Sequence, residues 1–423
     1  MAGERAAGLA PGALRGYPAA VFALSLAAYT TAQMDLALFG YAVPAIRAEF
    51  GLSLSGVMGI VSAAFVIGGL LIVALGVLTD RLGRRLMLQL SLVVSSLLVA
   101  LHAVAPNPAV LTVLRGSSIG VGGLTYPITG ALITEEFPAR VRGLFLGILQ
   151  IGYPLGWALA SVWAAWILKD YHWRWLFLFG LVSLPLALLV RRVVREPQRF
   201  AEARAAGAAP ARVRDLLAPG IRSRAVLLFC SQFLFVWAYA ASIFLFPSYL
   251  REVRGFEAFD FSVLIGAGNA IGVLGYLLAA FVGEFLLTRR TTVVLWTLTG
   301  ACCFQGLVWV AEGFTELLIA YALMSMFFYG SAAVKFAYLA EVFPTRLRAT
   351  AMATCGSLAV TLGSAAGPLM VARGIETIGW AEGYALLVGV PLVGAGLLYL
   401  LLTPVPSGLE VEDIDRLLSG RKA

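Results

Sequence analysis

Residues 135–142 read EEFPARVR, and residues 341–348 read EVFPTRLR. Both stretches fit the pattern Glu-x-Phe-Pro-x-Arg-x-Arg, and the second begins 206 residues after the first. Each stretch follows a long apolar run. The same pattern at equivalent places in two halves indicates an internal duplication. We therefore expect two parallel structural repeats with a central site between them.

The apolar runs around this repeat are long enough to cross a bilayer, which takes about 20 residues. Of the 423 residues, 60% are hydrophobic and only 13% are charged, whereas soluble domains carry about 25% charged residues. This composition excludes a soluble enzyme, a disordered chain and a coiled coil. The runs predict twelve spans at roughly 18–43, 54–78, 86–105, 109–134, 142–167, 175–191, 224–249, 261–287, 291–311, 316–340, 349–371 and 383–403.

The longest charged stretch, residues 192–223, falls between the sixth and seventh runs. It predicts an N-terminal six-helix bundle over 1–191, a cytoplasmic linker loop over 192–223, a C-terminal six-helix bundle over 224–403 and a cytoplasmic tail over 404–423. The expected fold is an all-α membrane protein with twelve transmembrane helices in two pseudo-symmetric bundles. Alternating access would then come from rocking of the two halves.

The net charge of +8 is unevenly distributed along the chain. Of the 31 lysines and arginines, 23 fall in the termini and in alternate loops, six fall in the opposite loops, and two lie inside apolar runs. Positive charge collects on the cytoplasmic side of membrane proteins, so this asymmetry predicts a plasma (inner) membrane protein with both termini in the cytoplasm. The basic excess sets topology and indicates no nucleic-acid partner.

The loop after the second run reads GVLTDRLGRR over residues 76–85. It resembles the G-x-L-x-D-R-x-G-R-[RK] loop of the major facilitator superfamily, and the six-plus-six plan extends this resemblance over essentially the whole chain. The resemblance implies a latch that steadies the outward-open state. Its glycines would permit tight approach of helix ends, while Asp80 would attract a neighbouring helix N-terminus. The alternative is that the charges only anchor topology. The candidate latch residues are Gly76, Asp80, Gly83, Arg84, Arg85, Glu135, Arg142, Glu341 and Arg348.

Finer resemblance favours the carboxylate:proton symporter branches of that superfamily. The segment from Asp35 to Gly40 looks like the D-G-x-D-x-x-x-x-G segment of aromatic-acid symporters, with Asp35 at the second acid and Ala32 in place of the first. Residues 142–153, RGLFLGILQIGY, are similar to the sialate and lactate branch. The sugar-porter signature P-E-S-P-R is matched only in part by REPQR at 195–199.

Three ionisable side chains lie inside the spans and away from their ends, namely Asp35, Arg115 and Lys335. A charge at the centre of a bilayer costs about 2.5–3.5 kcal/mol, so each needs a partner or a wet cavity. Asp35 comes nine residues before Pro44, and Arg115 comes nine residues after Pro106. Both should therefore lie about 13 Å from the same side. We predict an Asp35–Arg115 pair that lines the cavity.

Such a pair suits proton coupling, which we assign to Asp35 and Arg115. The carboxylate stays ionised beside the guanidinium until a substrate anion competes for the cation, and it can then take a proton. Arg115 also begins the pattern Arg-x-x-Ser-x-Gly-x-Gly, which is similar to the span-four arginine motif tied to proton transfer in the superfamily. The alternative is a purely structural ion pair.

Lys335 is one of three lysines in a chain with 28 arginines, and it precedes Glu341 by six residues. It should lie about 9 Å from the cytoplasmic end of its span. One interpretation is a point charge that receives a substrate carboxylate. The other is a side chain that snorkels to the interface.

Further polar and aromatic side chains lie on spans that line the cavity in the resembling fold. Gln150 and Tyr153 would orient the substrate, although each such residue can equally form a helix–helix hydrogen bond or an interface anchor. The candidate substrate-binding residues are Gln33, Arg115, Tyr126, Gln150, Tyr153, Trp237, Tyr239, Asn269 and Lys335.

No enzymatic constellation is evident, because His102 and His172 lie at span ends without a nucleophile or paired carboxylate nearby. We expect no metal and no cofactor. The resulting hypothesis is a monomeric secondary transporter in the lipid bilayer that moves a small organic anion, a monocarboxylate, together with protons. The alternatives are a symporter for a sugar or another neutral solute, a drug or metabolite exporter, and a membrane sensor that transports nothing.

Overall fold

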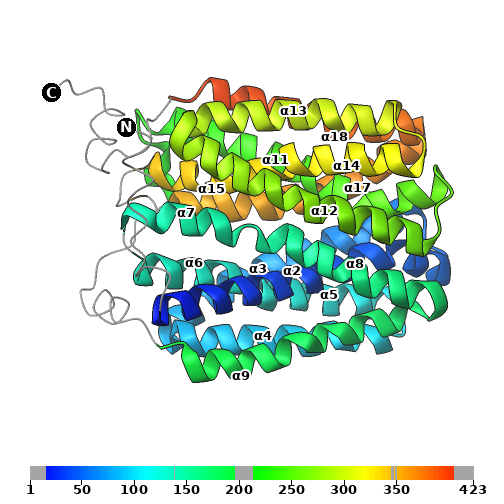
Figure 1. Cartoon of the computed structure of the whole chain (residues 1–423), viewed down its shortest axis with the longest axis horizontal. Coiled ribbons are helices and arrows are strands. Elements are labelled where there is room, and N and C mark those ends of the chain that lie inside the picture. Colours follow the sequence, from blue (N-terminus) through cyan, green and yellow to red (C-terminus); the bar gives the residue numbers. More distant parts are fainter. Residues whose placement is uncertain (1–15, 138, 196–212, 344–346, 348–349, 404–423) are drawn as a thin grey trace. The chain divides into compact units, whose positions relative to one another are not determined.

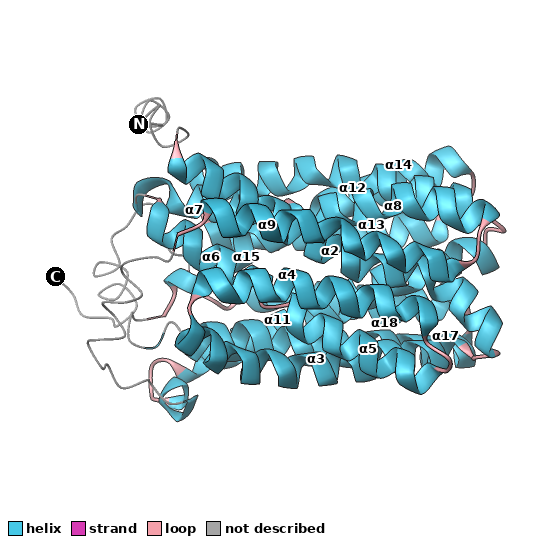
Figure 2. Ribbon diagram, turned by 90° about the horizontal axis from the view of Figure 1, so that it is seen from below, coloured by secondary structure: helices cyan, strands magenta, loops and turns pink. Residues whose placement is uncertain are grey.

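A computed structural model of the chain describes residues 16–137, 139–195, 213–343, 347 and 350–403. Within these ranges the side chains of residues 77, 80, 81, 135, 139–143, 340 and 341 are not described. Every regular element in the described ranges is a helix (Figure 2). Eleven of the described helices are long and apolar enough to cross a membrane. The prediction of an all-α membrane protein is therefore confirmed.

The elements of the first half begin with one of the longest helices in the described chain. They are α2 (Tyr17–Phe50), α3 (Leu54–Leu82), α4 (Arg84–Leu101), the 3₁₀ helix η1 (His102–Val104), α5 (Pro108–Gly122), α6 (Thr125–Glu136), α7 (Ala139–Leu149), α8 (Gly152–Asp170), the 3₁₀ helix η2 (Trp173–Ser183) and α9 (Leu184–Val193).

The second half follows the same alternation of long helices and short irregular turns (Figure 1). Its elements are the 3₁₀ helix η3 (Val213–Leu217), α11 (Arg222–Glu252), α12 (Ala258–Phe281), the π-helix η4 (Val282–Leu286), α13 (Arg289–Trp309), α14 (Phe314–Phe327), the 3₁₀ helix η5 (Tyr329–Ser331), α15 (Ala332–Glu341), the π-helix η6 (Met352–Leu358), α17 (Ala359–Ile378) and α18 (Trp380–Leu400).

Three predicted spans of the first half are interrupted, and a proline lies in the first turn of the helix after each break, with Pro185 the second residue of α9. Pro127 is the third residue of α6, and Pro154 is the third residue of α8. Proline lacks an N–H group and its ring clashes with the carbonyl four residues earlier, but the first turn of a helix tolerates it. The chain therefore restarts its helix just before each proline. The predicted span over 109–134 is split into α5 and α6, each shorter than a span, and this accounts for eleven qualifying helices where twelve spans were expected.

The chain divides into two compact units. Unit 1 contains Met1–Ala42 and Ala63–Ala208, and unit 2 contains Val43–Ser62 and Ala209–Ala423. The segment from Val43 to Ser62 belongs to unit 2, and the end of α2 and the start of α3 within it bind α11 and α17. Arg47 forms an ion pair with Glu252, and the Ser55 N–H donates to the Glu376 carboxylate at 2.8 Å.

The duplication recurs as a matching contact inside each unit. In unit 1, Arg85 at the start of α4 donates to the main-chain carbonyl oxygen of Arg191 near the end of α9. In unit 2, Arg290 at the start of α13 donates to the carbonyl oxygen of Leu402 just after α18, at 2.8 Å. Each arginine satisfies a carbonyl that the end of a helix leaves without a partner. The third and sixth spans of each half are thus joined in the same way.

Candidate functional site

Helix α5 carries Arg115, and glycines on its adjacent face set its position. A Cβ atom on Gly116 would lie 2.6 Å from Ile67 Cβ, and one on Gly120 would lie 2.5 Å from Leu71 Cβ. Two glycines four residues apart let helices approach closely in a membrane. Because these glycines press against α3, the neighbouring Arg115 side chain extends to α2.

The Arg115 guanidinium is bound to the main chain of α2. The residue is 1% exposed, Nη1 donates to the carbonyl oxygen of Asp35 at 3.3 Å, and Nη2 donates to that of Leu36 at 2.7 Å. The guanidinium also lies 4.6 Å from the centroid of the Phe39 ring, one turn further along α2. Its Nε atom has no hydrogen-bond partner in the described part of the chain.

The Asp35 carboxylate lies on the other side of this contact. Asp35 is 5% exposed, and its Oδ1 atom has no hydrogen-bond partner among the described residues. A Cβ atom built on Gly180 of η2 would lie 3.4 Å from Oδ1 and 2.6 Å from Val99 Cγ1 of α4. The structure therefore brings Asp35 and Arg115 together at one level, but the expected carboxylate–guanidinium pair is absent from the ion pairs of the described residues. The main-chain carbonyls of α2 take the guanidinium donors instead.

His102 lies in the same region of unit 1, where sequence analysis gave it no role. It is fully buried in η1, and its ring stacks on Phe177 with 4.9 Å between centroids. Nδ1 lies 2.8 Å from the Leu98 carbonyl oxygen and 3.1 Å from that of Val99. Carbonyl groups only accept, so Nδ1 carries the hydrogen and Nε2 is left as an acceptor. Nε2 has no hydrogen-bond partner within the described ranges.

Three tyrosines of unit 1 gather between α2, α6 and α8. Tyr126 and Tyr153 both pack in the apolar cluster that contains Tyr29, and the Tyr29 and Tyr126 ring centroids are 5.1 Å apart. Tyr153 also lies close enough to Arg115 to interact with it electrostatically. The structure thus groups two of the expected substrate-binding residues around Tyr29 and places one of them, Tyr153, near the buried cation.

The two predicted glutamines of unit 1 occupy different settings. Gln150 lies in the break between α7 and α8, where its carbonyl oxygen accepts from the Tyr153 N–H at 3.1 Å. Gln33 packs against Gly156 of α8, and its Oε1 atom is buried without a partner among the residues described. The Gln33 side chain therefore keeps hydrogen-bonding capacity that the described residues do not use.

Lys335 is the buried cation of unit 2. The residue is 3% exposed, and Nζ has no hydrogen-bond partner in the described part of the chain. Nζ lies 3.1 Å from the centroid of the Phe235 ring on α11 and 5.8 Å from that of Tyr399 on α18. A cation above an aromatic face is stabilised by the quadrupole of the ring. A buried Nζ does not fit the snorkelling alternative, in which the ammonium reaches the interface.

A glycine contact fixes the position of the helix that bears Lys335. Helix α14 ends at Phe327, and η5 turns the chain into α15. A Cβ atom on Gly330 would lie 2.8 Å from the main chain of Gly275 on α12, so the two backbones touch. Lys335 follows this point by five residues, and the close approach directs α15 into the core of unit 2.

The other predicted residues of unit 2 form contacts between helices. Trp237 Nε1 donates to the Leu387 carbonyl oxygen at 3.0 Å. Asn269 Nδ2 donates to the Tyr321 hydroxyl at 3.0 Å, while the Tyr239 ring lies 4.5 Å from that of Tyr329. These contacts match the alternative of helix–helix bonding more closely than a ligand site.

Comparison with models of protein families shows which family the chain belongs to. The model of the Major Facilitator Superfamily matches residues 25–287, which is more than half of the chain. The chain belongs to the major facilitator superfamily. It is therefore a membrane transporter and not an enzyme, and the resemblance of the loop at 76–85 is confirmed.

Relatives within the superfamily carry organic acids. The chain is 28% identical over 389 residues to the cis,cis-muconate transport protein of Acinetobacter baylyi, covering 85% of this chain and 87% of the relative. It is 26% identical over 326 residues to the gentisate transporter of Corynebacterium glutamicum, covering 75% and 72%. The crystal structure of a D-xylose-proton symporter shares the fold, with a TM-score of 0.72 at 17% identity over 92% of this chain and 98% of that chain.

The superfamily loop is only partly described. Gly83 adopts a φ of 94°, which favours glycine, and it separates α3 from α4. We expected Gly76 to permit the tight approach of helix ends, and this is wrong. No described atom lies within 4 Å of a Cβ placed there. Arg84 is half-buried, and Arg85 binds the end of α9. The side chains of Asp80, Glu135, Arg142 and Glu341 and the whole of Arg348 lie outside the described residues.

Sequence analysis missed the residues that surround the charges of this superfamily member. The partners of Arg115 are main-chain atoms, which no motif can display. Phe235 and Tyr399, beside Lys335, are two aromatics among many. Among these residues, only His102 could have been singled out from the sequence, since it is one of two histidines and ends an apolar run.

Proposed function

We propose that the protein is a secondary transporter that moves a small organic anion, a monocarboxylate, in symport with protons by alternating access. The chain sits in the plasma membrane with both termini in the cytoplasm. The observation that carries this proposal is Lys335 Nζ, a buried cation without a hydrogen-bond partner in the described chain. An ammonium taken out of water needs a compensating charge or acceptor, and a substrate carboxylate supplies both.

The balance of charge supports an anion over a neutral solute. Arg115 and Lys335 are buried well inside their units, and Asp35 is the one acid that sequence analysis placed at comparable depth. A buried positive charge in each unit attracts anions, and a neutral polyol has no need of it. Muconate and gentisate, the compounds that the two relatives are named for, are organic acids.

Asp35 is the proposed proton carrier. Its Oδ1 atom accepts no hydrogen bond from the described residues, because Arg115 donates to main-chain carbonyls instead. A carboxylate in this setting can bind a proton without first breaking an ion pair. Tyr153, near Arg115, and Tyr126, in the same apolar cluster, would orient the bound anion.

The superfamily loop provides the proposed conformational latch. Asp80, Arg84, Glu135 and Arg348 would hold the outward-open state on the cytoplasmic side, as the motif implies. Asp80→Asn should then reduce transport while the protein still inserts into the membrane. Wild-type transport rates in this variant would reject the latch.

The test is proton uptake into liposomes that contain the purified protein and an internal pH dye. Gentisate, cis,cis-muconate, lactate and D-xylose are each added outside at the same concentration. We expect acidification with gentisate or lactate, which carry one carboxylate each, and none with D-xylose. A response to cis,cis-muconate alone would reject the monocarboxylate, because muconate carries two carboxylates. Protein-free liposomes correct for acids that cross the lipid unaided.

A pair of lysine variants makes the assay specific for Lys335. Lys335→Met should abolish the acid-driven signal, whereas Lys169→Met, an exposed lysine in the last turn of α8, should keep it. A response to D-xylose, or equal signals from both variants, would reject the proposed function.

A further inference from the structure

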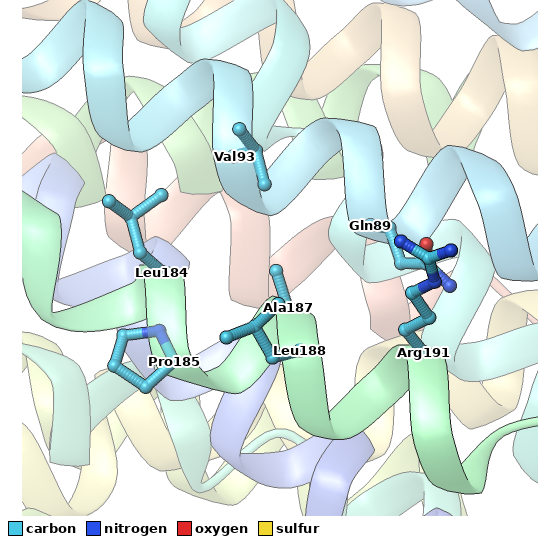
Figure 3. Close-up of a pocket in the computed structure, with 7 residues that line it drawn as sticks. All are labelled: Gln89, Val93, Leu184, Pro185, Ala187, Leu188 and Arg191. Atoms are coloured by element: carbon cyan, nitrogen blue, oxygen red, sulfur yellow. The ribbon is translucent and has the colours of Figure 1, made fainter.

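A groove of about 390 Å³ runs along the surface of unit 1 between α4 and α9 (Figure 3). These two helices lie side by side in Figure 1, joined by the bond from Arg85 to Arg191. None of the residues that line the groove belongs to the Asp35–Arg115 region or to the superfamily loop. The proposed transport function therefore leaves this groove without a role.

The groove has an apolar length and a polar end. Val93, Leu184 and Leu188 line its length, and the Leu188 side chain is 64% exposed on α9. Gln89 of α4 and Arg191 of α9 line one end, and Figure 3 labels both. In a membrane protein an exposed leucine of a spanning helix faces acyl chains, so the apolar length is open to lipid.

The polar end lies where basic residues collect. Gln89 is near the start of α4, and Arg191 is near the end of α9. Arg192 and Arg195 follow directly and are exposed, while Arg85 of α4 holds the Arg191 carbonyl group. No carboxylate of the described residues forms an ion pair with Arg191. The Arg191 guanidinium thus places a positive charge and several hydrogen-bond donors at the edge of the membrane-spanning region, and no carboxylate of the described residues neutralises it.

We propose that this groove binds one anionic phospholipid. The phosphate accepts hydrogen bonds from Arg191 and Gln89, and one acyl chain lies along Val93, Leu188 and Leu184. Arginine matches a phosphate with two parallel hydrogen bonds, and basic pockets between spanning helices hold anionic head groups. The lipid would bridge the third and sixth spans of unit 1 beside the bond from Arg85 to Arg191.

The chemistry favours a lipid over a soluble anion. A soluble phosphate or carboxylate would use only the polar end, and it would leave the apolar length of the groove exposed to acyl chains. A zwitterionic lipid would bring its own cation close to Arg191, which like charge disfavours. Of these three ligands, only an anionic lipid fills the apolar length of the groove and also neutralises its cationic end.

The test measures lipid binding by the full-length protein, without transport. Purified protein in detergent is titrated with phosphatidylglycerol or phosphatidylcholine, and bound lipid is counted by native mass spectrometry. Melting temperature is followed in parallel. Wild-type protein should retain phosphatidylglycerol in preference to phosphatidylcholine. Arg191→Gln should weaken that binding about five-fold, the factor expected for one arginine at an anionic surface.

Neighbouring residues provide matched controls for both parts of the groove. Arg192→Gln removes the same charge from the same helix end but lies outside the groove, so it should bind phosphatidylglycerol like wild type. Leu188→Trp should block the apolar length, whereas Leu189→Trp, also exposed on α9 but not part of the lining, should not.

The outcomes separate a defined site from general attraction. Loss of phosphatidylglycerol binding and of its stabilising effect in the Arg191 and Leu188 variants alone supports the proposal. Equal losses in Arg191→Gln and Arg192→Gln would mean a diffuse basic surface and would overturn it. Equal retention of both lipids by wild type would overturn it as well. Neither result depends on the substrate or on proton coupling.

Discussion

Arg115 is bonded to Asp35 through the Asp35 main-chain carbonyl oxygen, 3.3 Å from Nη1, while the carboxylate atom Oδ1 takes no part in that bond. The Arg115 guanidinium of α5 thus binds the backbone of α2 and not the Asp35 carboxylate. Two consequences follow for experiment. The guanidinium should matter for stability, and the carboxylate should matter for protons.

Arg115→Lys keeps the charge but removes the planar fork that spans two carbonyls. A lysine ammonium can replace one of the bonds to Asp35 and Leu36, and it leaves the other carbonyl without this donor. Hydrogen bonds from charged groups contribute about 1.5–3 kcal/mol, so the melting temperature of the purified protein should fall by several degrees. Arg192→Lys, at an exposed site, should melt like wild type. An unchanged melting temperature in Arg115→Lys would show that the two carbonyl bonds contribute little.

Asp35→Asn should separate folding from coupling. The amide has the same shape as the carboxylate, and no ion pair of the described residues is lost, so the melting temperature should stay close to wild type. In a symporter that loads a proton on Asp35, wild-type uptake rises as the external pH falls, because protonation becomes more frequent. The variant cannot bind that proton, so its uptake should be low and flat with pH.

The control for this prediction is Asp170→Asn, an exposed acid at the end of α8, which should keep the rise at low pH. Radiolabelled substrate uptake between pH 5 and 8 measures both variants. A pH-dependent uptake in Asp35→Asn equal to that of wild type would assign coupling to another group, with buried His102 next in line.

Gly180→Ala should strain the wall beside Asp35. The added methyl would lie 2.6 Å from Val99 Cγ1 and 3.4 Å from Asp35 Oδ1. Overpacking of this kind costs about 1–3 kcal/mol, which thermal melting detects. Val99→Ala should restore part of the loss in the double variant, because the two residues share one contact. Gly306→Ala, where no described atom lies within 4 Å of the added Cβ, should cause no such loss. A double variant that only adds the two single effects would contradict the contact.

Lys335→Met should abolish anion uptake without lowering the melting temperature. Methionine has a similar length, and it removes a buried charge that no described hydrogen-bond acceptor stabilises. Replacing buried charges by apolar residues is often neutral or stabilising. Melting in detergent and uptake in liposomes give the two readouts. If the melting temperature fell by several degrees, Lys335 would instead be a structural cation held by Phe235 and Tyr399.

The sequence by itself determined the class of molecule, the duplicated plan and the three charges that lie within the spans. Apolar length acts on each segment separately through the bilayer, so helices can be found without knowing their neighbours. The superfamily loop could also be recognised, because its pattern is local. Eleven helices qualify as spans where twelve were predicted, because Pro127 restarts the helix inside the predicted run over 109–134.

Only the tertiary structure decided which atoms meet. The direction in which Arg115 extends depends on the rotation of α5, which the glycines pressed against α3 set. That rotation brings the guanidinium to carbonyl oxygens, which every residue possesses and which no sequence pattern can distinguish. The burial of His102, the aromatic surroundings of Lys335 and the groove between α4 and α9 arise in the same way. The spacing of residues along the chain specifies how deep each side chain lies in the membrane. The rotation and packing of each helix specify which group that side chain contacts.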